Sequence, residues 1–378
     1  MHRAKKRIVI EFLVALAVIA GFFLLYHYEE TNIETSLANT FPSSALALGQ
    51  VVSTDPATNV VTVAVLTGAD KGQTITVTQQ PVSSSSTASN YLPYLPGEKV
   101  ILAKDSLGGV TGESYYITDR FRLPMLFFII LLFAVVAVLF GRMRGLTSIV
   151  GLGVSIGVLG WYVVPQILGG ADPLTVCLIG AALIAVTSLY LAHGFNRRTT
   201  VALCGTLLTL GVSAVLAVLF VDATRLMGFG TDVTFYLAIG TNTSINLRGI
   251  LLGGIIIGAL GVLDDVTIGQ AATVVELKDA NPALGMAELY RRGMSVGREH
   301  IASLINTLFL AYTGVALPVI LYLVAFQSQI PLWLTLNGEP IAEEVVRTMV
   351  GSIGIILAVP ITTALAAWVF GRAHGTKK

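Results

Sequence analysis

The chain has 378 residues, of which 54% are hydrophobic and 12% are charged, and its formal net charge is +1. A typical soluble domain is about 25% charged, so this composition excludes a soluble globular protein. No basic stripe with interleaved aromatic residues occurs, so we expect no nucleic-acid partner. Several apolar runs approach or exceed the length of about 18 residues that indicates a transmembrane helix. The sequence therefore predicts a polytopic α-helical membrane protein with the lipid bilayer as its solvent.

The hydrophobic segments predict eight transmembrane helices. The first follows a basic run, His2–Arg7, and has no small-residue cleavage site, so we interpret it as an uncleaved signal anchor rather than a signal peptide. The third contains Gly151, Gly153, Gly157 and Gly160, and is a candidate for unwinding or for tight packing. The eight segments are residues 8–27, 122–141, 146–166, 174–193, 200–220, 248–267, 301–325 and 346–370.

Lysine and arginine residues predict the orientation of these helices. With the N-terminus inside, 15 of the 23 lysine and arginine residues fall on the cytoplasmic side, and the short outer connections have few. Because cytoplasmic loops carry the excess of positive charge, both termini are predicted to be cytoplasmic. The predicted parts are a basic N-terminus with the anchor helix at 1–28, an extracytoplasmic domain at 29–120, a seven-helix membrane domain at 121–371 with a cytoplasmic amphipathic segment at 268–297, and a cytoplasmic tail at 372–378.

The polar region of residues 29–120 is predicted to form a small β-barrel-like domain of the OB or SH3-like type. Its β-rich runs are separated by turn signals such as Asp55-Pro56 and Gly68–Gly72. It has no aromatic stacking platform and no cationic groove, so we favour a module that packs or docks an extracytoplasmic protein partner over oligonucleotide binding. The predicted strands are residues 49–53, 60–66, 73–79, 99–103 and 114–121, and a low-complexity loop spans 81–97.

Asp264 and Asp265 are two adjacent carboxylates at the inner end of an apolar, glycine-rich segment. A charge near hydrocarbon is costly, so an acidic pair there indicates a functional site. On a helical wheel, Asp265 shares a face with Gly254, Gly258 and Gly261, so we expect Asp265 to face a helix–helix contact. The alternative is structural: both carboxylates lie among the headgroups, and Asp264 caps a following helical turn.

The segment after this pair supplies candidate partners. Asn281-Pro282 predicts a helix start, and the helix is expected to enter the membrane at Arg298, Glu299 and His300. An acid beside a cation and an imidazole is able to relay protons or bind a cation, so Arg298 and His300 are the expected partners of the aspartates. The alternative is a hydrogen-bonded contact that only joins two helices, at about 0.6 kcal/mol per bond. The residues expected to line the path are Arg298, Glu299, His300, Ser303, Asn306 and Thr307, with Thr313 on the same polar stripe.

Signatures of enzymes are missing from the sequence. It contains no His-Glu-x-x-His motif, no Gly-x-Ser-x-Gly motif and no P-loop. Asp222 and Asp232 are predicted at the opposite end of the bundle from the Asp264 pair, too far away for an intramembrane aspartyl protease. We therefore expect neither an enzyme nor a bound metal ion or cofactor.

Other polar residues in hydrophobic segments are interpreted as structural. Cys177 and Cys204 both lie in predicted spans and indicate no disulfide framework and no cysteine-based metal site. His193 precedes a glycine at a helix end, where cationic side chains offset the helix dipole. Glu343 and Arg347 have the spacing of an i,i+4 ion pair at the start of the last span.

Two stretches of the sequence carry a family likeness. Gly261–Leu277, GVLDDVTIGQAATVVEL, and Glu288–Pro318, ELYRRGMSVGREHIASLINTLFLAYTGVALP, closely resemble the YibE/F-like family of bacterial multipass membrane proteins. The likeness is specific in these motifs and looser over the rest of residues 121–370. It implies a permease or another integral protein of the bacterial cell membrane, with no assigned substrate. The family usually has an aspartate where this chain has Glu299, which keeps the charge and lengthens the side chain.

These features lead to two hypotheses for the function. The first is a secondary transporter or permease for a small molecule or an ion, in which Asp264 and Asp265 couple movement to protons or to a cation. The alternative is a non-transporting envelope scaffold or assembly factor that presents the β-domain to an extracytoplasmic partner. Transport requires the aspartate pair, whereas a scaffold requires residues 45–118 and tolerates substitution of the pair.

Overall fold

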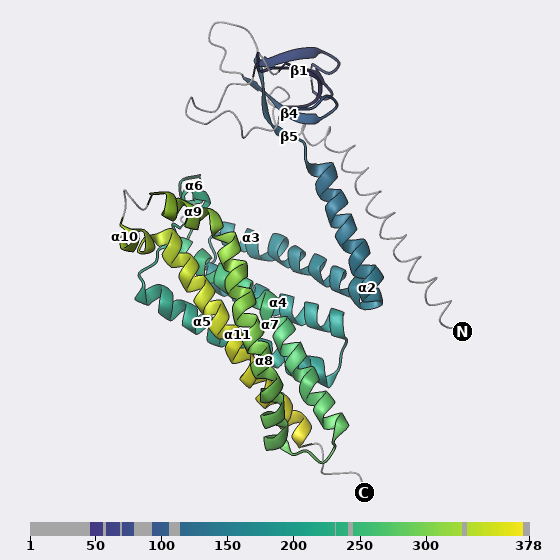
Figure 1. Ribbon diagram of the computed structural model, residues 1–378, viewed down its shortest axis with the longest axis vertical. Helices are drawn as coiled ribbons and strands as arrows, with labels where there is room; N and C mark the ends of the chain where they lie inside the picture. The colour runs from purple at the N-terminus through teal and green to yellow at the C-terminus, as the bar shows by residue number, and fades with distance from the viewer. Residues whose placement is uncertain are drawn as a thin grey trace, which may run out of the picture. The chain divides into compact units, whose positions relative to one another are not determined.

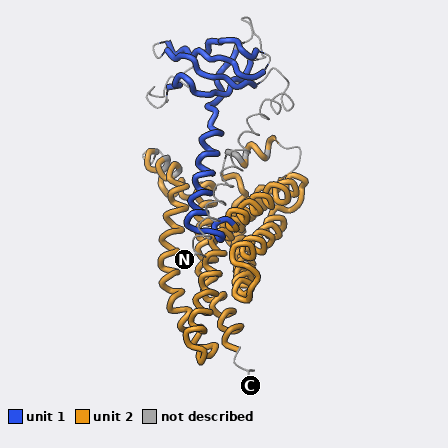
Figure 2. Tube along the Cα trace, turned by 90° about the vertical axis from the view of Figure 1, so that its right-hand side faces the viewer, with its two compact units in different colours: residues 1–146 blue, residues 147–378 orange. Residues whose placement is uncertain are grey.

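The structure is a computed structural model, and it describes residues 46–55, 58–68, 70–78, 93–105, 114–230, 232–240, 245–326 and 331–372 (Figure 1). The first predicted span, residues 8–27, and residues 81–92 of the predicted loop lie outside the described residues. The chain divides into two compact units, residues 1–146 and 147–378, which Figure 2 colours separately.

The first unit contains a curled antiparallel sheet of five strands in the order β3-β2-β1-β4-β5. All five predicted strands are confirmed. Valines alternate with smaller or polar residues along the sheet, so one face collects a buried core around Val61, Val63 and Leu102. The strands are β1 (Leu46–Asp55), β2 (Val60–Val65), β3 (Thr74–Thr78), β4 (Lys99–Asp105) and β5 (Ser114–Arg120).

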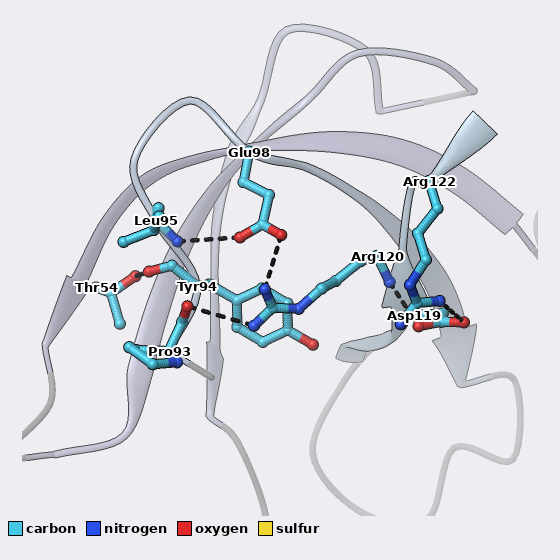
Figure 3. Close-up of polar contacts among 8 residues, drawn as sticks. All are labelled: Thr54, Pro93, Tyr94, Leu95, Glu98, Asp119, Arg120 and Arg122. Atoms are coloured by element: carbon cyan, nitrogen blue, oxygen red, sulfur yellow. Dashed lines mark hydrogen bonds and ion pairs between the residues drawn. The ribbon is translucent and has the colours of Figure 1, made fainter. Parts of the chain in front are cut away.

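Two polar ties hold the edges of this sheet. Asp70, between β2 and β3, accepts a hydrogen bond from the Tyr115 hydroxyl of β5 and lies 3.2 Å from the Lys104 ammonium of β4. At the other end, the Arg120 guanidinium lies 3.0 Å from the Glu98 carboxylate and 4.7 Å from the centre of the Tyr94 ring (Figure 3). The Asp70 contacts join the β2–β3 turn to β4 and β5. The edge strands β3 and β5 also contact each other, so the sheet is curled.

The two predicted spans at 122–141 and 146–166 form α2 (Leu123–Val158), which bends sharply at Arg142. The backbone there leaves the helical region, with φ 55° and ψ −135°. Gly145 follows the bend, and a Cβ at this position would lie 2.8 Å from the carbonyl carbon of Ala137. Glycine is therefore needed to let the chain turn back so closely, and the two predicted helices are confirmed as separate segments on either side of the bend.

The helix continues from α2 through a π-helical turn, η2 (Leu159–Val163), into the short α3 (Val164–Leu168). The glycine-rich third span was a candidate for unwinding, and its end does widen into this turn. Val163 is buried there against Gly180 of α4 (Pro173–His193). Asp172 caps α4 by accepting a hydrogen bond from the Thr175 amide at 3.0 Å.

The core of the second unit is formed by three long helices that pack against one another: α5 (Arg197–Ala223), α7 (Leu247–Ala280) and α11 (Glu339–Gly371). α4 packs against α7, and α8 (Met286–Val315) packs against α11 and α7 (Figure 1). Small residues permit these close contacts, as is usual for helices in membranes. The remaining described helices are α6 (Asp232–Gly240), α9 (Leu317–Phe326) and α10 (Leu332–Leu336).

Two details of the α7–α8 connection differ from the prediction. α7 continues 13 residues beyond the expected end at residue 267, because Thr267 and Gln270 pack inside the protein rather than at a surface. The expected helix start at Asn281-Pro282 is wrong: Asn281 caps the end of α7, and α8 begins at Met286. The chain between them is a tight turn in which the Leu284 amide bonds to the Asn281 carbonyl.

Five helices in the described part of the chain are long and apolar enough to cross a membrane. They are the 46-residue stretch Leu123–Leu168, which contains two of the predicted spans, together with α4, α5, α7 and α11. The predicted span at 301–325 is helical, but it is divided between α8 and α9 at Ala316.

At the end of the bundle where α11 begins, two carboxylates hold the segment after α5. Glu339 accepts hydrogen bonds from the amides of residues 227–229 at 2.6 to 3.3 Å, and Glu343 accepts one from Gly230 at 2.9 Å. The Glu343 side chain is buried by this contact, so the predicted Glu343–Arg347 pair is wrong. Arg347 instead lies 3.7 Å from Glu344.

Candidate functional site

A buried polar seam runs through the contact of α5, α7 and α11. In α5, Thr199, Thr206 and Ser213 recur every seven residues and are fully buried. This spacing places them on one face of the helix, which packs into the bundle. α7 adds Thr267 and Gln270, and α11 adds Thr362 and Thr363, all at most 2% exposed. Buried polar side chains in a membrane protein are costly unless they are bonded or functional, so the seam is the candidate site.

The middle of the seam contains Asp264. The Thr206 and Thr267 hydroxyls lie 2.8 Å apart across the α5–α7 contact. Thr206 also interacts with the Asp264 carboxylate, and the Thr267 hydroxyl donates to the Asp264 backbone carbonyl at 3.2 Å. One carboxylate oxygen, Oδ1, is buried without a hydrogen-bond partner. This oxygen is an open acceptor in the interior, of the kind that a proton or a cation would satisfy.

Asp264, and not Asp265 as expected, is the aspartate that faces a neighbouring helix. Asp264 is half-buried in the seam, whereas Asp265 is exposed. The glycine face that Asp265 shares is exposed as well: a Cβ added at Gly254 or Gly261 would meet nothing within 4 Å. Gly258 lies closer to a neighbour, since an added Cβ would be 3.8 Å from the Tyr312 hydroxyl of α8. At Asp265 itself, the expected helix–helix contact is wrong for the described residues. Asp264 caps no new helix, because α7 continues past it without a break.

The seam extends from Asp264 towards the end of α7. Gln270 accepts a hydrogen bond from the Thr363 hydroxyl of α11 at 3.0 Å, and Thr363 also bonds to the Val359 carbonyl of its own helix. Gly297 of α8 lies against the Gln270 amide, since an added Cβ would be 3.0 Å from its nitrogen. Pro360 has no backbone N–H to donate within α11, and it comes two residues before Thr362 and three before Thr363. The seam thus touches α5, α7, α8 and α11.

The predicted path residues on α8 do not join the seam. All six are exposed on the face of α8 that is turned away from its packing partners, while Leu289, Gly293, Gly297 and Leu308 face the bundle. No ion pair links either aspartate to a basic residue within the described part of the chain, so the expected pairing is wrong there. These six residues are Arg298, Glu299, His300, Ser303, Asn306 and Thr307.

Sequence reasoning missed the threonines and Gln270. Each is common in ordinary helices, and none stands out in a hydrophobic segment as a charge does. The signal that would have found this face is the seven-residue spacing of Thr199, Thr206 and Ser213. Seven residues are about two helical turns, so residues with this spacing lie on one face of the helix.

These features define a helical membrane protein with a buried carboxylate in its bundle, joined in sequence to a small β-sheet unit. The model of the YibE/F-like protein family matches residues 129–372, about two thirds of the chain. The chain therefore belongs to the YibE/F-like family, as the two sequence motifs indicated. No curated protein matches the chain, and no solved structure matches it either.

Proposed function

We propose that this protein is a permease of the bacterial cell membrane in which Asp264 takes up and releases a proton or binds a cation. The observation that supports it most is the buried Oδ1 of Asp264, which has no hydrogen-bond partner. A carboxylate is expensive to keep in a membrane interior, and such residues mark ion and proton pathways. The substrate would be a small molecule or an ion.

The depth of Asp264 supports a place inside the hydrocarbon layer. Thr206, which touches it, is nine residues from Arg197 along α5, or about 14 Å at 1.5 Å per residue. In the other direction, Asp222 is 16 residues away, or about 24 Å, and forms an ion pair with Arg248. If these charges mark the two headgroup levels, the carboxylate lies well within a layer about 30 Å thick.

The proposed path follows the seam from Asp264 through Thr267 to Gln270 and Thr363. Hydroxyl and amide groups spaced along one helix face are able to pass a proton or to coordinate a cation in steps. Two irregular helices of this unit, the π-helical turn η2 beside α4 and α11 with Pro360, are the kind of segments that shift in transporters. Asp265 and the six exposed residues of α8 would contact the path only in another state of the protein.

The proposed topology has eight transmembrane helices, both termini in the cytoplasm, and a β-domain of the OB or SH3-like type outside. The distribution of lysine and arginine supports this orientation. Green fluorescent protein fused after residue 378 should fluoresce, and alkaline phosphatase inserted at residue 110 should be active. The reverse pattern would overturn the orientation.

Asparagine substitutions test the role of Asp264. A deletion strain is first screened for growth against metals, antimicrobial peptides and metabolites, and variants are then tested for complementation. Asp264→Asn keeps the shape of the side chain and removes its charge, so it should abolish complementation while membrane levels stay normal. Asp265→Asn is the matched control, because the same change is made one residue away on an exposed side chain. Full complementation by Asp264→Asn would exclude the coupling role.

The second candidate is an envelope scaffold that presents the β-domain to an extracytoplasmic protein. It is favoured by the close packing of the seam, where an added Cβ at Gly205 would meet Thr362 and one at Gly354 would meet Ser213. For a scaffold, deletion of residues 45–118 should remove function while Asp264→Asn retains it. The two variants together therefore separate the candidates.

A further inference from the structure

A groove of 620 Å³ lies where the end of α4 and the beginning of α5 meet the end of α11. Its floor is apolar, with Val201, Cys204 and Leu365. Two aromatic side chains, Phe195 and Trp368, stand at its rim and are 88% and 45% exposed. An apolar channel with an aromatic rim is the form of a site for a lipid chain near the membrane interface, where tryptophan and tyrosine gather.

One end of the groove is strongly basic. Arg197 lines it, Arg198 is next in sequence, and the Arg372 guanidinium lies 4.7 Å from the Trp368 ring. The sequence has no acidic residue in 173–221 or in 345–378, the parts of α4, α5 and α11 that include the groove. Among the ion pairs of the described residues, none involves Arg197 or Arg198, and the buried Nε of Arg198 has no hydrogen-bond partner.

The position of these two arginines at the start of a helix favours the binding of an anion. Arg197 and Arg198 are the first two residues of α5, next to its N-cap Asn196. The N-terminal end of a helix carries partial positive charge, so cations there are opposed by the helix dipole, while a phosphate is favoured. An anion at this end would therefore offset the charges of both arginines and also interact favourably with the N-terminal end of the helix dipole.

We propose that this groove binds an anionic phospholipid, with its phosphate at Arg197, Arg198 and the start of α5 and one acyl chain against Val201, Cys204 and Leu365. Basic pockets between helices on the cytoplasmic side of membrane proteins bind such headgroups. The site is distinct from the Asp264 seam and does not depend on transport. It gives this end of the bundle a preference for negatively charged lipid.

Cys204 provides a probe inside the groove, and the buried Cys177 an internal reference. The full-length protein is placed in nanodiscs of phosphatidylcholine, with or without phosphatidylglycerol, and reacted with N-ethylmaleimide. Modification of each cysteine is followed by mass spectrometry of peptides. Phosphatidylglycerol should slow the labelling of Cys204 several-fold and leave Cys177 unreactive. Equal rates in the two lipids would overturn the proposal.

Charge and apolar contact are tested separately by substitution. Arg197→Gln with Arg198→Gln should weaken the protection by phosphatidylglycerol on the order of tenfold. Arg291→Gln with Arg292→Gln is the matched control, since that basic pair on α8 binds Glu288 and does not line the groove. It should retain full protection, and equal loss in both double variants would overturn the site. Inorganic phosphate should give no protection, and protection by phosphate alone would indicate a free-anion site instead.

A second variant keeps the proposal testable if the arginine variant does not fold. Leu365→Trp fills the floor of the groove and leaves both arginines in place. Native mass spectrometry then measures the anionic phospholipid that remains bound after detergent washing. Wild-type protein should retain it and Leu365→Trp should lose it, whereas equal retention would exclude the groove as the acyl-chain site.

Discussion

The Thr206 hydroxyl of α5 lies 2.8 Å from the Thr267 hydroxyl of α7, and this contact places α5 beside the Asp264 carboxylate. Both side chains are fully buried. The pair therefore joins α5 to α7 next to the carboxylate. Thr206 also interacts with the Asp264 carboxylate itself.

Removal of the Thr206 hydroxyl should destabilise the bundle modestly. Thr206→Val keeps the shape and loses the contacts with Thr267 and with the Asp264 carboxylate, each worth about 0.6 kcal/mol on average in a membrane interior. Thr187→Val is the control, because the Thr187 hydroxyl bonds only to carbonyls of its own helix. Unfolding in mixed sodium dodecyl sulfate micelles measures both variants. An equal effect of the two substitutions would contradict the contribution of the interhelical bond.

Glycine substitutions should distinguish the packed face of the bundle from the exposed one. Gly205→Ala would bring a Cβ to 3.2 Å from the Thr362 Cβ, and such overpacking costs about 1–3 kcal/mol. Gly254→Ala makes the same change in α7 where nothing lies within 4 Å, so it should be neutral or stabilise by about 0.5–1 kcal/mol. The same micelle titration compares them. Destabilisation by Gly254→Ala would show that this face is covered.

The Glu339 carboxylate should control the order of the segment after α5. It accepts the amides of residues 227–229, and bonds to a charged acceptor contribute about 1.5–3 kcal/mol. Glu339→Ala should therefore speed hydrogen exchange at these amides. Glu344→Ala is the control, since Glu344 contacts only Arg347 at 3.7 Å in the described ion pairs. Unchanged exchange in Glu339→Ala would show that the Glu339 carboxylate does not hold this segment.

Acid should weaken the interactions of the Asp70 carboxylate with Tyr115 and Lys104. The Tyr115 hydroxyl and then the Lys104 ammonium hold the pKa of Asp70 below its usual value of 3.8. Because the folded pKa is lowered, its contribution to stability is present above pH 3.8 and is lost as the pH falls through the folded pKa.

Hydrogen exchange of β3 and β5, corrected for the intrinsic rate, measures this effect in the full-length protein. Asp70→Asn should exchange faster than wild type at pH 7, and the difference should shrink towards pH 3. A difference that persists unchanged in acid would assign the effect to packing instead of charge.

Much of the architecture follows from local sequence. The five strands were predicted because valines alternate between turn signals, and the described membrane helices because their apolar runs are long. Helix ends were less predictable. α7 continues beyond the predicted end of its span because α5 and α11 bury Thr267 and Gln270, which no hydropathy pattern indicates.

The sequence by itself determined that an acidic pair lies in an apolar helix, because a charge among hydrophobic residues is visible in any single segment. Only the tertiary structure decided which member is buried. Adjacent residues on a helix point about 100° apart, so one face must be chosen, and the choice depends on where the neighbouring helices pack. Thr206, on the buried threonine face of α5, meets Asp264, and Asp265 is left on the exposed glycine face.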